Sequence, residues 1–76
     1  MDIKTFIENF VETNELEDAS AITEKTVFKE LEEWYSLTAL ATISMIDDEY
    51  GVTITNKELR SVDTIEELFN LVQSKM

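Results

Sequence analysis

A serine at the start of an uncharged stretch is the residue of this chain best placed to carry chemistry. Ser36 belongs to the run Glu-Glu-Trp-Tyr-Ser-Leu at residues 32–37, and no charged residue occurs over residues 34–46. A serine hydroxyl is a poor nucleophile unless a neighbouring base activates it. The chain has no histidine and no cysteine, which excludes a Ser-His-Asp triad, a cysteine nucleophile and a His/Cys metal site. Covalent chemistry at Ser36 therefore requires a separate enzyme.

The composition indicates one small, acidic domain over residues 1–76. The chain has seventeen acidic and six basic residues, giving a formal net charge of −11. Such a surface repels nucleic-acid phosphates and anionic membranes, so we expect neither as a partner and instead expect proteins with basic patches. The alternative is that the acidity only aids solubility. No apolar run approaches a membrane span, and no signal-peptide pattern follows Met1. The default expectation is a cytoplasmic monomer.

The first part of the chain predicts one helix and a long loop. Apolar residues at helical spacing form one stripe after Asp2, which can cap the helix: Ile3, Phe6, Ile7, Phe10 and Val11. Asn14 is a plausible end, because asparagine tolerates the left-handed conformation that follows many helices. Residues 15–33 predict a long acidic loop with one helical turn near residues 27–31. Its apolar residues should hold it on the core, namely Leu16, Ile22, Phe28 and Leu31.

The second part of the chain predicts three further helices and no sheet. A long helix over residues 37–50 should have Ser36 as its N-cap and Gly51 at its end. Two capping boxes follow, in which a threonine and a glutamate three residues later satisfy each other's free backbone donors. They are Thr55 with Glu58, opening a short helix to about Ser61, and Thr64 with Glu67, opening a last helix to about Ser74, with Asp63 as a competing cap.

This order of long helix, long loop, long helix, short helix and helix resembles the acyl carrier protein family over nearly the whole chain. The strongest part covers residues 34–72. It includes Ser36-Leu37, the run Asp-Asp-Glu-Tyr-Gly-Val at 47–52 and the run Val-Asp-Thr-Ile at 62–65. The resemblance implies an all-α fold, a small four-helix bundle with a long first loop and a short third helix. It would place Ser36 exposed at one end, beside a groove between the second and third helices.

The resemblance also implies a function. In that family a serine at the start of the second helix receives a 4'-phosphopantetheine arm, whose thiol carries acyl or aminoacyl groups as thioesters. Ser36 would be the attachment site in a phosphoprotein of fatty acid or polyketide biosynthesis that is not itself an enzyme. The implied partners are a phosphopantetheinyl transferase, which uses coenzyme A and magnesium, and acyl-activating or acyl-transferring enzymes with basic or apolar docking patches. No residue is expected to be catalytic or to bind a metal.

Two departures from the acyl carrier pattern lead to an alternative function for the protein. Tyr35 stands where the family has an aspartate, and the start of the second helix lacks the family's acidic residues. The apolar residues of that helix spread around much of its circumference. We expect Leu40, Ile43 and Ile46 in the core. Leu37, Ala41 and Met45 would form a face for partners, with packing in the core as the alternative. The alternative function is an unmodified interaction module on the carrier fold. Glu30, Glu32 and Glu33 are either solvated acidic residues or help to dock a basic partner near Ser36.

Overall fold

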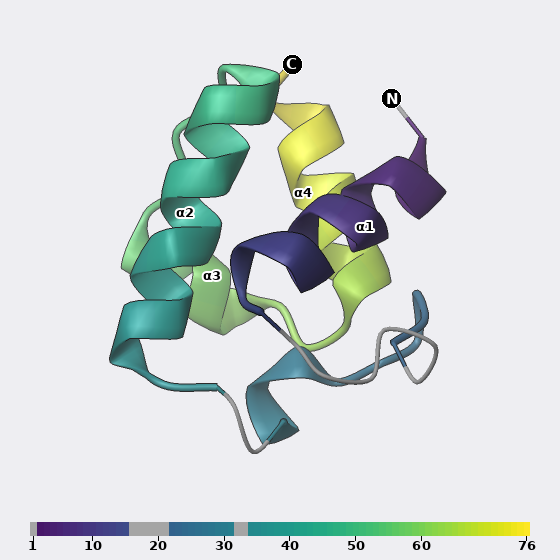
Figure 1. The fold of residues 1–76 in the computed structure, drawn as a ribbon. Coiled ribbons are helices and arrows are strands. Elements are labelled where there is room, and N and C mark those ends of the chain that lie inside the picture. The colour runs from purple at the N-terminus through teal and green to yellow at the C-terminus, as the bar shows by residue number, and fades with distance from the viewer. Residues whose placement is uncertain (1, 16–21, 32–33) are drawn as a thin grey trace.

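A computed structural model of the protein describes residues 2–15, 22–31 and 34–76. The elements are α1 (Ile3–Thr13), a 3-10 helix η2 (Phe28–Glu30), α2 (Ser36–Tyr50), α3 (Asn56–Ser61) and α4 (Ile65–Ser74), shown in Figure 1. The described residues contain no strand, and Val27 and Thr64 form one isolated antiparallel bridge. The predicted all-α four-helix bundle is therefore confirmed, including the helical turn within the long loop.

Helix α1 begins and ends where the sequence predicts, although its end is built differently. The Asp2 carboxylate accepts a hydrogen bond from the Lys4 backbone N–H at 3.3 Å and caps the first turn. Asn14 is the C-cap of α1, but its backbone is not left-handed, since its φ is −96°. The left-handed conformation occurs at the next residue, Glu15, with φ of 51°. The Asn14 carboxamide instead donates to the Phe10 carbonyl at 3.0 Å and to Thr42 Oγ1 at 3.1 Å. It thereby joins the end of α1 to α2.

Helix α2 starts one residue earlier than predicted, and the expectation that Ser36 is its N-cap is wrong. The extended backbone that defines the cap falls on Tyr35, with φ of −129° and ψ of 177°, so Ser36 is the first helical residue. The Tyr35 side chain makes no capping hydrogen bond, since its hydroxyl lies at the far end of a ring that is 67% exposed. In the reverse direction, the Tyr35 N–H donates to Thr38 Oγ1 at 3.2 Å. Gly51, with φ of 65°, ends the helix as predicted.

Both predicted capping boxes are present and start α3 and α4. The Glu58 N–H donates to Thr55 Oγ1 and the Thr55 N–H donates to Glu58 Oε1, each at 3.1 Å. The Glu67 N–H donates to Thr64 Oγ1 at 3.1 Å, and Glu67 Oε1 accepts from the N–H groups of Thr64 and Asp63. Thr64 is therefore the cap of α4, and Asp63 lies before it.

An aromatic core joins the loop to the helices. Phe10 and Phe28 are fully buried. Trp34, just before α2, stacks on Phe10 with ring centroids 6.2 Å apart and meets Phe28 edge-on at 5.0 Å. Ile22 is also buried and Leu31 packs against the core, as predicted, whereas Leu16 lies outside the described residues. The sequence between α1 and α2 is thus anchored next to the start of α2.

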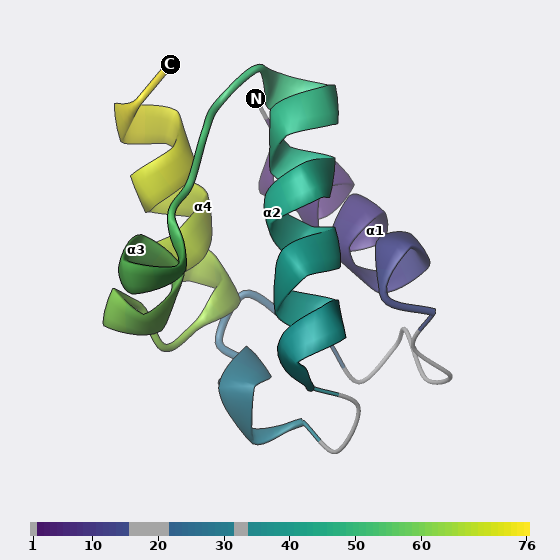
Figure 2. The ribbon, with the colours of Figure 1, turned by 90° about the vertical axis from the view of Figure 1, so that its left-hand side faces the viewer.

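The residues that α2 buries and exposes differ in part from those predicted. In Figure 2, α2 lies between α1 and the pair α3–α4, and it packs against α1 and α3. Ile46 is buried and Leu37 is 79% exposed, as expected. Leu40, predicted for the core, is 54% exposed, and Met45, predicted for a partner face, is only 6% exposed. Ile43 is half-buried and packs against the core, as predicted, and Ala41 is half-buried. A helix that is apolar on all sides gives no sequence signal for the side that meets the core.

Candidate functional site

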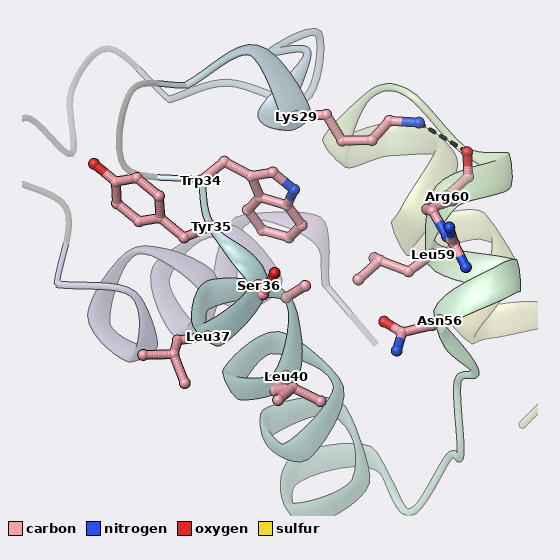
Figure 3. A pocket seen from close by; sticks show the side chains of 10 residues that line it. Lys29, Trp34, Tyr35, Ser36, Leu37, Leu40, Asn56, Leu59 and Arg60 are labelled. Carbon is pink, nitrogen blue, oxygen red and sulfur yellow. Dashed lines mark hydrogen bonds between the residues drawn. The ribbon is translucent and has the colours of Figure 1, made fainter.

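Ser36 lies at the edge of an open groove between the start of α2 and α3, seen from close by in Figure 3. The groove encloses about 810 Å³. It is lined by Lys29, Trp34, Tyr35, Ser36, Leu37, Ala39, Leu40, Asn56, Leu59 and Arg60. Ser36 is exposed at this end of the bundle. The position beside a groove between the second and third helices, which the resemblance implied, is therefore the position that Ser36 occupies.

The lining of the groove is mostly apolar. Leu59 of α3 is buried and Trp34 is half-buried, so both are held in place by the core. Leu37 and Leu40 stand one turn apart on α2 and are largely exposed. In Figure 3, Trp34 and Ser36 lie on the α2 side of the groove, the Leu37 side chain points away from α3, and Leu59, Asn56 and Arg60 lie on the facing side. An open apolar groove of this kind suits a flexible chain with apolar segments.

The polar lining residues are cationic or neutral. The Lys29 ammonium donates to the Arg60 carbonyl at 2.8 Å and lies 3.1 Å from Asp63 Oδ1. These contacts tie η2 to the end of α3 and fix one side of the groove. Asn56, the first residue of α3, adds a carboxamide. Among the described residues, no aspartate or glutamate lines the groove.

Among the described lining residues, none is a base for the Ser36 hydroxyl. The Ser36 hydroxyl makes no hydrogen bond to another described residue, and none of the described lining residues is a carboxylate that would take its proton. The acidic groups with shifted pKa values serve the helix starts instead. The pKa of Glu58 lies below its ordinary 4.5 because Lys75 and the Thr55 N–H hydrogen-bond its carboxylate. The arrangement leaves the exposed Ser36 accessible to an external enzyme.

Three further expectations concerned the acidic residues before Ser36, metal sites and membrane spans. Glu32 and Glu33 lie outside the described residues, while Glu30 is exposed at the end of η2. Across the parts that the structure describes, no three His, Cys, Asp or Glu side chains gather as a metal site would require. Within those same parts, every helix is too short or too polar to cross a membrane.

Sequence reasoning missed Lys29, Asn56, Leu59 and Arg60 as lining residues. They come from the loop and from α3, and only the fold brings them opposite Ser36. A signal was available for two of them. Lys29 and Arg60 are two of only six basic residues in the chain, and scarce cations in an acidic protein are worth testing as ligand contacts.

Comparisons with models of protein families, with curated proteins and with solved structures found no match. The function must therefore be argued from the groove and from Ser36 themselves.

Proposed function

We propose that the protein is an acyl or aminoacyl carrier that holds its cargo as a thioester on a 4'-phosphopantetheine arm attached to Ser36. The observation that carries the proposal is the position of Ser36, exposed as the first residue of α2 at the edge of an open, mostly apolar groove. The proposal includes a monomeric cytoplasmic carrier of fatty acid or polyketide biosynthesis. A phosphopantetheinyl transferase would load the arm, and acyl-activating or acyl-transferring enzymes would be the further partners.

The start of α2 favours a phosphodiester on Ser36. The first turn of this helix contains no acidic residue, so a phosphate there meets no like charge from that turn. The positive end of the helix dipole and the free N–H groups of a first turn stabilise anions. An arm leaving Ser36 would enter the groove directly, with Leu59 and Trp34 on its apolar sides and the Asn56 carboxamide near its amide groups.

The test is the intact mass of the protein after co-expression with a transferase of broad specificity. We expect one phosphopantetheine, mapped to Ser36. Ser36→Ala should remove it. Because Ser36 is exposed and is not the N-cap, this change should alter the stability by no more than about 0.5 kcal/mol. Ser44→Ala, an exposed serine of the same helix, should keep the adduct. An adduct on another serine, or none while a control carrier is fully labelled, would refute the proposal.

A second candidate function is supported by the exposed apolar residues at the start of α2. Tyr35, Leu37 and Leu40 are 67%, 79% and 54% exposed. Exposed apolar groups that lie together mark many protein interaction surfaces. An unmodified interaction module would bind its partner through these residues. Neither the original protein nor the Ser36→Ala variant would then carry an adduct. Binding of the partner would survive Ser36→Ala and would be weakened by Leu37→Asn.

A further inference from the structure

The segment between α1 and α2 supplies hydrogen-bond partners that the later helices lack within themselves. The first N–H groups of an α-helix have no acceptor inside their own helix. At the start of α4, the Ile65 N–H donates to the Thr26 carbonyl at 3.1 Å. The next N–H, that of Glu66, donates to the Glu24 carbonyl at 2.8 Å. A distant part of the sequence therefore completes the start of α4.

Lys29, in the same segment, completes the end of α3. This helix has only six residues, and a helix of that length is not stable on its own. It ends at Val62 with an extended backbone, and not at a glycine in the left-handed conformation. The Lys29 ammonium donates to the Arg60 carbonyl at 2.8 Å, as Figure 3 shows, and lies 3.1 Å from Asp63 Oδ1. These two contacts hold the last turn of α3 against η2.

The two ends of α3 are held in different ways. At the start, the capping box of Thr55 and Glu58 is local, and the Glu58 carboxylate also pairs with Lys75 at the end of α4. At the end, the side chains of Lys29 and Asp63 are 26% and 70% exposed. A carboxylate that is this exposed is open to other cations, and salt screens its ion pair. The end of α3 can therefore be released while its start stays in place.

We propose that Lys29 is a latch on α3, which keeps the last turn helical while it pairs with Asp63 and lets that turn open when another cation takes the carboxylate. The ion pair positions the ammonium at the Arg60 carbonyl, and without the pair the flexible stem of Lys29 is free to leave. Leu59 is buried and keeps α3 on the core, so the opening is local. Because Arg60 lines the groove, the latch sets the order of that side of it. The inference concerns the unmodified chain and is independent of the proposed function.

The test is amide hydrogen exchange of the unmodified full chain, followed by NMR at low salt. Lys29→Met keeps most of the stem of the side chain but removes the charge and the donor. In this variant the amides of Arg60 and Ser61, in the last turn of α3, should exchange about three- to tenfold faster than in the original protein. The Leu59 amide, whose hydrogen bond lies at the start of the helix, should change less. Lys25→Met removes an equal charge from an exposed position of the same segment and should leave all three rates unchanged.

Salt and Asp63→Asn test the competition for the carboxylate. In the original protein, raising sodium chloride from about 20 mM to about 500 mM should speed exchange at Arg60 and Ser61 about two- to threefold relative to Leu59. This comparison within one helix reduces the influence of salt on the overall stability. Asp63→Asn should show the faster exchange already at low salt and should respond little to added salt.

Several results would overturn the latch. Exchange at Arg60 and Ser61 might stay unchanged in Lys29→Met, or rise by the same factor as exchange of the α1 amides, which would indicate global destabilisation only. An equal effect of Lys25→Met would point to net charge and not to the latch. A salt response that survives Asp63→Asn, or no measurable protection of the two amides in the original protein, would equally contradict it.

Discussion

Replacing Tyr35 tests the start of α2, next to the proposed attachment site Ser36. Tyr35 holds the N-cap position of α2, but its side chain accepts no hydrogen bond from the first turn. Aspartate at this position can accept such a bond and places a negative charge at the positive end of the helix dipole. We therefore expect Tyr35→Asp to stabilise the start of α2 and to increase the rate at which a transferase modifies Ser36.

The magnitude follows from two opposing contributions. A good N-cap contributes about 1 kcal/mol relative to alanine. The Tyr35 ring is 67% exposed, so its removal loses about a third of the burial energy of an aromatic side chain, roughly 0.5–1 kcal/mol. Tyr35→Asp should therefore leave the stability of the protein close to its original value. Tyr35→Ala loses the ring without gaining a cap, and it is the proper reference. The aspartate variant should melt about 4–8 °C above the alanine variant.

Melting curves and labelling rates of three variants separate the causes. Tyr35→Asn supplies the cap without the charge, so it should approach Tyr35→Asp in stability. It should be labelled more slowly, because a transferase with the proposed basic docking patch would be attracted to a carboxylate and not to a neutral amide. If Tyr35→Asp melts no higher than Tyr35→Ala, the cap assignment is wrong. If Tyr35→Asp is labelled no faster than the original protein, the proposed role of the charge is refuted.

Two further predictions concern the scaffold. Thr42 is fully buried, and its hydroxyl accepts a hydrogen bond from Asn14 and donates one to the Thr38 carbonyl. Thr42→Val should therefore lower the free energy of unfolding, measured in urea, by about 1–3 kcal/mol. An unchanged midpoint would contradict this. Hydrogen bonds from the N–H groups of Thr64 and Asp63 lower the pKa of Glu67 below its ordinary 4.5. The Glu67 carboxylate therefore contributes fully to the free energy of unfolding above pH 4.5. This contribution is lost as the pH falls through the lower pKa of Glu67 in the folded protein. Glu67→Gln should lose that acid dependence, whereas Glu66→Gln should keep it.

The sequence by itself determined the elements whose cause is local. The capping boxes at Thr55 and Thr64 depend on partners three residues away, so their backbone hydrogen bonds could be predicted without any knowledge of the fold. Gly51 ends α2 because a positive φ suits a residue without a side chain. The first helix followed from one apolar stripe, which leaves a single way to bury it. The element order, and with it the all-α class, rests on these local signals.

Only the tertiary structure decided the sides of α2 and the composition of the groove. Leu40 is exposed and Met45 is buried because α1 and α3 meet particular sides of a helix that is apolar all round. The N-cap of α2 is Tyr35 and not Ser36, since the extended backbone at the start of the helix occurs at Tyr35. Arg60 reaches the site because α3 packs against α2, across about 24 residues of sequence from Ser36. Such contacts depend on how whole helices pack, and no local pattern of residues encodes that packing.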